Sequence, residues 1–115
     1  MVEIKEMSKD FTKVDIYRMT LDNGITSCKD LEDGTEIEVE GYITYLDIKE
    51  NGKEEEVFAI KATDGKVYAC TSKTFARNVR DMAKLYEDEG GIFTIIKMSG
   101  KTKADKPFIM ATLKC

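Results

Sequence analysis

The sequence predicts an all-β domain with one helix, in the order strand, strand, strand, helix, strand, strand. Three observations predict it: strict alternation of apolar and polar residues over 36–48, hairpin signals at one Asn-Gly and one Asp-Gly step, and a helical period over 73–89. At 115 residues the chain has room for one domain of ordinary size. We expect residues 35–115 to form this domain, and residues 1–34 to form an N-terminal segment whose pattern indicates at most an extra strand and a turn.

The first strand has the clearest pattern in the chain. Over Glu36–Ile48, Ile37 and Val39 lie on one face and glutamates lie on the other, which is the period of a half-buried strand. Gly41 interrupts this alternation. A glycine inside a long strand often marks a bulge or a bend, and a small barrel needs such a point to curve. We therefore expect the first strand to bend near Gly41.

Two hairpins should connect this strand to the next two. Asn51-Gly52 predicts a turn into a second strand over 55–63, and Asp64-Gly65 predicts a turn into a third strand over 66–72. Because each connection is a tight turn, neighbouring strands should run in opposite directions. The first three strands should therefore form an antiparallel meander.

The helix follows the third strand. Apolar residues recur at every third or fourth position over 73–89, which places one apolar stripe on a helix of about four turns. Gly90-Gly91 ends this helix. Two runs rich in β-branched and aromatic residues, 91–99 and 106–115, predict the fourth and fifth strands, and a lysine-rich loop over 100–106 joins them.

The first 34 residues carry weaker signals. Residues 11–21 alternate well enough to predict a strand, and Asp22-Asn23-Gly24 predicts a turn after it. No apolar run approaches the roughly 18 residues that a membrane-spanning helix needs. We therefore expect a cytoplasmic protein with no membrane partner.

Missing residue types exclude several classes of enzyme and metal site. The chain has no histidine, which removes Ser-His and Cys-His nucleophile pairs and zinc sites that contain histidine. Its three cysteines, Cys28, Cys70 and Cys115, form no CxxC pair and are odd in number, so neither a zinc ribbon nor a disulfide framework is expected. We predict no cofactor, no metal site and no catalytic activity.

Charge is distributed unevenly along the chain. The formal net charge is -4, but residues 1–56 contain 16 acidic and 7 basic residues, whereas residues 57–115 contain 6 acidic and 11 basic residues. The first half therefore carries -9 and the second half +5. Exposed charges are screened beyond roughly 8 to 10 Å at ordinary ionic strength, so a ligand responds to the local potential and less to the net charge. A basic second half is compatible with a nucleic-acid partner.

The order of elements resembles the OB-fold, a five-stranded Greek-key barrel that binds oligonucleotides and oligosaccharides across its second and third strands and its long loops. The resemblance covers residues 35–115, and the helix falls between the third and fourth strands, as in that family. The last segment, SGKTKADKPFIMATL, is similar to the final hairpin of small single-stranded-DNA-binding proteins of the phage type, in which a basic loop precedes an aromatic strand. The chain has no tryptophan, a common stacking residue in those proteins.

This resemblance implies a non-catalytic protein that binds single-stranded DNA with weak sequence preference, in replication or recombination, with RNA as a partner and self-association both left open. Such binding needs a positive groove that follows the phosphates and aromatic faces on which bases stack. Lys61, Lys66 and Tyr68 are expected to share the outer face of the second and third strands. The full set of candidate DNA-binding residues is Tyr42, Tyr45, Lys49, Lys53, Lys61, Lys66, Tyr68, Lys97, Lys101, Lys103, Lys106 and Phe108.

Two other interpretations remain open. A small barrel needs large inward side chains, so several of the aromatic residues could simply fill it, and lysines in a surface loop are commonly only solvated. The chain could instead be a protein–protein interaction module, such as a phage inhibitor or assembly factor, that uses its acidic first half to meet a basic partner.

Overall fold

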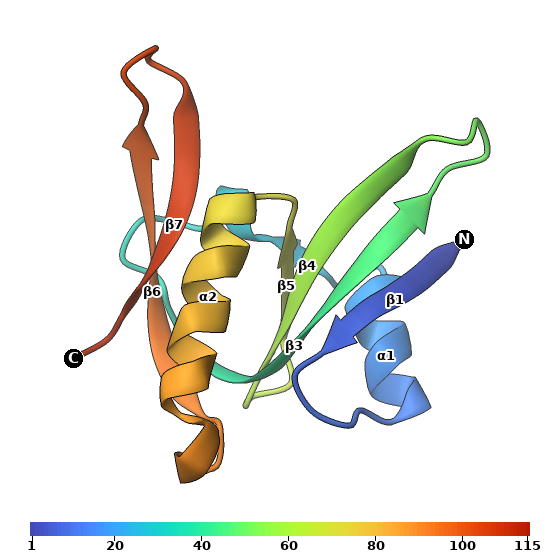
Figure 1. Cartoon of the computed structure of the whole chain (residues 1–115), viewed down its shortest axis with the longest axis horizontal. Coiled ribbons are helices and arrows are strands. Elements are labelled where there is room, and N and C mark those ends of the chain that lie inside the picture. Colours follow the sequence, from blue (N-terminus) through green and yellow to red (C-terminus); the bar gives the residue numbers. More distant parts are fainter.

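A computed structural model describes all residues, 1–115, and confirms the expected fold class. The expected order of three strands, one helix and two strands is present over the second part of the chain, and the sheet curls into an open barrel like that of an OB-fold (Figure 1). The elements are β1 (Val2–Met7), α1 (Lys13–Thr20), β2 (Thr26–Ser27), the 3-10 turn η1 (Cys28–Asp30), β3 (Glu36–Ile48), β4 (Glu54–Ala62), β5 (Val67–Cys70), α2 (Lys73–Leu85), the 3-10 turn η2 (Glu87–Glu89), β6 (Phe93–Lys101) and β7 (Pro107–Leu113).

All strands belong to one sheet in the order β2-β5-β4-β3-β6-β7, and β1 pairs with β3 beside this path. The long β3 makes this possible because its first half pairs with β6 and its second half pairs with β1. The two halves meet at Gly41, where the pairing with β4 shifts register. A Cβ atom at Gly41 would lie 2.7 Å from the ring of Phe11, so the bend needs a glycine for close approach and confirms the expected bulge.

The curled sheet buries apolar side chains on both faces. The inner face holds the larger core, in which Phe75 and Val79 of α2 pack against Phe58 and Ile60 of β4. The outer face of β3, β4 and β5 carries a second core around Met19 of α1. Because α1 covers this outer face and β1 pairs with β3 beside it, residues 1–34 occupy a surface that the sequence pattern left free.

The prediction of a strand over residues 11–21 is wrong, because this segment forms α1. Thr12 caps the helix by accepting a hydrogen bond from the backbone N–H of Asp15 at 3.1 Å. Ile16 and Met19 turn towards the sheet at a spacing of three residues, and Met19 is fully buried. Short segments can satisfy both periods, and contact with the sheet decides between them. The additional strands are β1, which precedes this segment, and the two-residue β2, which follows it.

The barrel is open between β5, whose free side holds only the two-residue β2, and β7, which pairs with neither of them. The first half of α2 lies along β7 at this opening (Figure 1). The amide of Ala111 donates to Oδ1 of Asn78 at 3.2 Å, and the Ser72 hydroxyl donates to the carbonyl of Ile109 at 3.5 Å. These bonds satisfy two backbone groups on the free edge of β7, and they fix the position of α2 against this strand. None of the helices combines the length and hydrophobicity needed to cross a membrane.

Candidate nucleic-acid interface

A groove of about 850 Å³ lies at the opening between β5 and β7, and we call it the seam groove. Its floor and walls come from β2, η1, β4, β5, the start of α2, β6 and β7. Two long hairpins, β3–β4 and β6–β7, project from the body on either side of it (Figure 1). The residues that line the seam groove are Ser27, Lys29, Asp30, Glu55, Val57, Ala69, Cys70, Thr71, Ser72, Ser99, Pro107, Phe108 and Ile109.

Phe108 is the one aromatic residue that lines the seam groove. It lies directly opposite Gly100 in the β6–β7 ladder, and a Cβ atom added to Gly100 would lie 2.7 Å from the Phe108 ring. The ring therefore packs over the bare backbone of the neighbouring strand, while its side chain stays only partly buried. Because this packing already restricts the ring, little conformational entropy is lost when a ligand stacks on its exposed face.

Four cations without an ion-pair partner lie in the seam groove or on segments that adjoin it. Lys103 and Lys106 are exposed in the β6–β7 loop, and Lys73 follows directly after the groove residue Ser72. Lys29 lines the groove itself. None of these four side chains makes an ion pair, whereas Lys101 makes an exposed one with Asp105 at 3.6 Å. A cation without a partner can bind a phosphate without first breaking an internal contact.

The groove has a basic side and an acidic side. Asp30 and Glu55 line it from η1 and β4 and outnumber Lys29, the one cation of that side, whereas Phe108 and the unpaired lysines Lys73 and Lys106 belong to, or directly adjoin, β7 and α2. A polyanion in the groove should therefore place its phosphates towards β7 and α2.

Cys70 lines the groove, and a second thiol, Cys28, lies beside it in the core. The parallel pairing of Ser27 with Ala69 brings the next residues, Cys28 and Cys70, side by side in the inner core. A hydrogen bond with Cys28 lowers the pKa of the Cys70 thiol, and the same contact, together with burial, raises the pKa of Cys28. Both side chains are buried, and Cys70 contributes to the groove lining by packing.

Comparison with known protein families now identifies the class of ligand. Residues 6–114 match the family of phage single-stranded DNA-binding proteins of the Phi29 type. The chain belongs to this family. Searches of curated proteins and of solved structures gave no match. The expected family and its ligand, single-stranded DNA, are thereby confirmed, and the matched range includes α1 and the end of β1 in addition to the barrel.

In this phage single-stranded DNA-binding protein, the structure brings together only part of the residue set expected from the sequence. Phe108 lines the seam groove, Lys101 ends β6, and Lys103 and Lys106 lie in the loop that leads to Phe108. The remaining eight residues lie in the two cores, in ion pairs or on other parts of the surface.

The tyrosines of β3 pack inside the protein. Tyr42 is 8% exposed and its ring lies 5.1 Å from that of Phe58, in the inner core. Tyr45 is 5% exposed and packs in the outer core beside Met19. Burial is the main cause that raises the pKa of both phenols. Their rings offer little surface to a base.

The pairing register separates Tyr68 from Lys61. Tyr68 lies opposite Ile60 and packs against the inner core, whereas Lys61 lies opposite Val67. Directly opposed residues of an antiparallel pair share a face, so the expectation that Tyr68 lies on the outer face with Lys61 is wrong.

The two lysines of this pair of strands differ in their surroundings. Lys61 binds the carboxylates of Glu40 at 3.0 Å and Asp15 at 3.3 Å, because α1 covers this part of the sheet. Hydrogen bonds to these carboxylates, that of Glu40 foremost, raise the pKa of Lys61. Lys66 is exposed in the β4–β5 turn, at the other end of β4 from the β3–β4 loop.

Lys97 is a structural residue of the inner face. It follows Phe93 and Ile95 in the alternation of β6 and is 3% exposed. Its ammonium group donates to the carbonyl of Leu31 at 2.7 Å and binds Asp33 at 3.1 Å. These contacts tie the segment after η1 to the base of the β6–β7 hairpin.

Lys49 and Lys53 lie at the tip of the β3–β4 hairpin among more numerous carboxylates. Lys49 binds Asp47 at 2.8 Å, and both the hydrogen bond and the charge of Asp47 raise the pKa of Lys49. Lys53 precedes the exposed run Glu54–Glu56. The local potential at this tip is therefore negative and unfavourable for phosphate.

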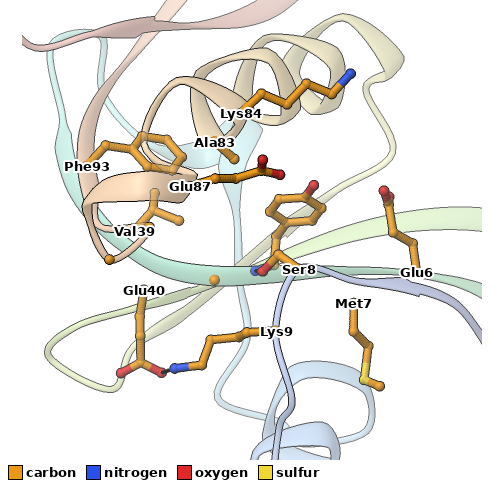
Figure 2. A pocket seen from close by; sticks show the side chains of 14 residues that line it. Glu6, Met7, Ser8, Lys9, Val39, Glu40, Ala83, Lys84, Glu87 and Phe93 are labelled. Atoms are coloured by element: carbon orange, nitrogen blue, oxygen red, sulfur yellow. Dashed lines mark hydrogen bonds and ion pairs between the residues drawn. The ribbon is translucent and has the colours of Figure 1, made fainter.

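A second hollow, of about 510 Å³, lies between β1, β3 and the end of α2 (Figure 2). Three glutamates and two lysines line it, and Figure 2 shows Lys9 reaching to Glu40, an ion pair of 3.6 Å. Glu6 is held by Arg80 at 2.8 Å. Its lining carries one net negative charge, as does that of the seam groove with Lys29, Asp30 and Glu55. The lysine-rich β6–β7 loop beside the seam groove therefore distinguishes the two hollows, and the charge of the lining does not.

The sequence interpretation missed Lys29 and Lys73 as residues of the site. Lys29 lies in a segment with no readable pattern, and only the parallel pairing of β2 with β5 brings it to the groove. Lys73 could have been found, because it stands at the start of a helix that directly follows the third strand of the barrel.

Proposed function

We propose that this protein binds single-stranded DNA in the seam groove without catalysing a reaction, with weak sequence preference, during phage DNA replication or recombination. The observation that carries the proposal is the position of Phe108: a restrained aromatic face lines a groove whose adjacent loop bears Lys101, Lys103 and Lys106. Stacking of one base on an aromatic side chain contributes about 1 to 3 kcal/mol, and lysines along the groove hold the backbone.

Weak sequence preference follows from the kind of contact available. Every base has a face that can stack on Phe108, and the lysines contact phosphates, which are the same at every nucleotide. A protein that covers single strands exposed during replication needs this tolerance.

The test is a titration of the protein with oligo-dT and with duplex DNA of equal length, at several salt concentrations. We expect tighter binding to the single strand, and a slope of log affinity against log salt of about -2 to -3.5, for roughly 3 to 5 phosphate contacts. Absence of binding to oligo-dT at low salt would reject the proposal.

Phe108→Ala tests the groove itself. We expect it to weaken oligo-dT binding by about 5- to 150-fold, which corresponds to the loss of one stacked base. The matched control is Tyr17→Ala, which removes an aromatic ring that is 53% exposed on α1, on the outer face of the sheet. Equal affinities of the two variants would place the stacking site elsewhere.

A further inference from the structure

A strand bound in the seam groove has two directions in which to continue, and they differ in charge. On the side of β4 it meets Glu55, which lines the groove, and the neighbouring exposed residues Glu54 and Glu56. The β3–β4 hairpin from Asp47 to Glu56 contains five carboxylates and two lysines. A polyanion is repelled along this path.

On the other side the groove continues onto α2. Ser72 lines the groove and caps this helix, since its hydroxyl accepts a hydrogen bond from the backbone N–H of Phe75 at 3.1 Å. Lys73 and Arg77 follow in the first two turns, and both are exposed. Positions i and i+4 of a helix lie about 5 to 6 Å apart on one face, so the two cations form a short row that starts at the groove.

The row is ready to accept phosphates because neither cation has an internal partner. No carboxylate lies within ion-pair distance of Lys73 or Arg77, whereas Arg80 on the same helix is bound to Glu6 and also donates to the Thr44 hydroxyl at 2.6 Å. Arg80 therefore stabilises the fold, and Lys73 and Arg77 remain available.

The position of this row relative to the groove is rigid. Asn78 and Ser72 both bond to the backbone of β7, the strand that carries Phe108. The aromatic face and the two cations therefore belong to one structural unit, α2 together with β7, shown side by side in Figure 1.

We propose that single-stranded DNA leaves the seam groove over the first two turns of α2, where Lys73 and Arg77 bind successive phosphates. This inference rests on the proposed function, because it extends the same binding site. It implies that the solvent-exposed side of α2 sets the number of nucleotides that one protein molecule covers. An acidic segment, Glu87–Glu89, follows at the far end of the helix and limits the track to its first half.

The experiment compares two double charge reversals, Lys73→Glu/Arg77→Glu on α2 and Lys13→Glu/Arg18→Glu on α1. Each changes the net charge equally at exposed helical cations that have no ion-pair partner. Binding is measured with oligo-dT of about 6 nucleotides, which is near the lower end of the usual site of one such domain, and of about 20 nucleotides, which exceeds that site.

For the α2 variant we expect about 10- to 100-fold weaker binding of the long oligonucleotide, and a salt slope smaller by about 1.4, or about 0.7 for each lost phosphate contact. Binding of the short oligonucleotide should change by less than about threefold. The α1 variant should bind both oligonucleotides within about threefold of the wild type, since α1 lies on the outer face.

Three results would overturn the track over α2. They are equal losses in the α1 and α2 variants, an unchanged long-oligonucleotide affinity in the α2 variant, and a loss of the same size for both lengths. Circular dichroism and thermal melting check that each variant is folded, and Lys73→Gln/Arg77→Gln repeats the test if charge reversal unfolds the helix. Failure of the proposed function looks different, because the wild-type protein would then bind neither length.

Discussion

The two hairpins beside the seam groove have the same architecture and opposite charge. The β3–β4 hairpin carries -3 between Asp47 and Glu56, whereas the β6–β7 loop carries +2 between Lys101 and Lys106. Both project from the same side of the body (Figure 1). Because exposed charges act over roughly 8 to 10 Å, the two hairpins create separate potentials within one small molecule. An overall charge of -4 therefore says little about the partner of this protein.

The hairpins also differ in how their strands are anchored. The β6–β7 hairpin is fixed at its base by the buried Lys97, and its Phe108 ring packs over Gly100. The β3–β4 hairpin presents polar side chains along its outer half, and Glu54–Glu56 are all exposed. The firmly held hairpin carries the aromatic face, which fits a role in ligand binding. The acidic hairpin would direct the DNA away from β4.

The largest effect should come from reversing the basic loop. Lys101→Glu/Lys103→Glu/Lys106→Glu should weaken oligo-dT binding by about 100-fold or more at low salt, because three phosphate contacts are replaced by repulsion. The matched control is Lys5→Glu/Lys13→Glu/Arg18→Glu, which changes the net charge equally on β1 and α1. Fluorescence anisotropy measures both. Comparable losses would show that net charge alone controls binding, and would break the comparison between the hairpins.

The anchor of the basic hairpin gives an intermediate effect, on stability. Asp33→Asn removes the charged partner of the buried Lys97, so the melting temperature at pH 7 should fall. Hydrogen bonds from Ser99 and from Lys97 lower the pKa of Asp33 in the folded protein. Its stabilisation is therefore complete above the ordinary carboxyl pKa of 3.8 and is lost as the pH falls through the lower, folded-state value.

The difference in melting temperature between wild type and Asp33→Asn should accordingly shrink below about pH 4. Asp64→Asn is the control, since this residue of the exposed β4–β5 turn has no ion-pair partner. A difference that stays constant from pH 7 to pH 3 would contradict the role of the Asp33 charge.

The smallest effect should come from neutralising the acidic hairpin. Glu54→Gln/Glu55→Gln/Glu56→Gln should strengthen oligo-dT binding by about three- to tenfold at low salt, because repulsion on one side of the groove is relieved. The gain should disappear at high salt, where exposed charges are screened. Replacing the equally acidic run with Glu87→Gln/Asp88→Asn/Glu89→Gln is the control, because η2 lies at the far end of α2. Weaker binding in the first variant would mean that the acidic hairpin helps to hold the DNA.

Much of the barrel could be predicted from local patterns. Three predicted features depend only on neighbouring residues: the alternation of β3, the Asn-Gly and Asp-Gly turns, and the apolar stripe of α2. The structure confirms all three. Gly41 was also recognised as the bend of the barrel. The segment 11–21 was misread because a short run can fit both the strand and the helix period, and contact between Met19 and the sheet decided for the helix.

The binding residues were harder to predict because exposure depends on distant contacts. Tyr42 and Tyr45 lie on opposite faces of β3, and both faces are covered, one by α2 and the other by α1. Lys97 looked like a surface cation at the end of a strand, yet β6 continues to Lys101 and its alternation turns Lys97 inward. No local pattern shows that the Leu31 carbonyl and the Asp33 carboxylate bind the Lys97 ammonium group on the inner face of the sheet.

By itself, the amino-acid sequence determined the order of the barrel elements, the bend at Gly41, the chemical class of the lysine-rich final hairpin and the family. These features depend on residues that are close together along the chain. The tertiary structure decided which aromatic face is open, which cations lack partners and where the groove lies. Phe108 is available because β7 pairs only with β6 and has no second strand partner at the opening of the barrel, and Tyr68 is packed inside because its register with Ile60 turns it inward. The exposure of each ring and the pairing of each cation depend on contacts between segments that are far apart in the chain. At each site, burial against another segment or an ion pair with it competes with solvation by water.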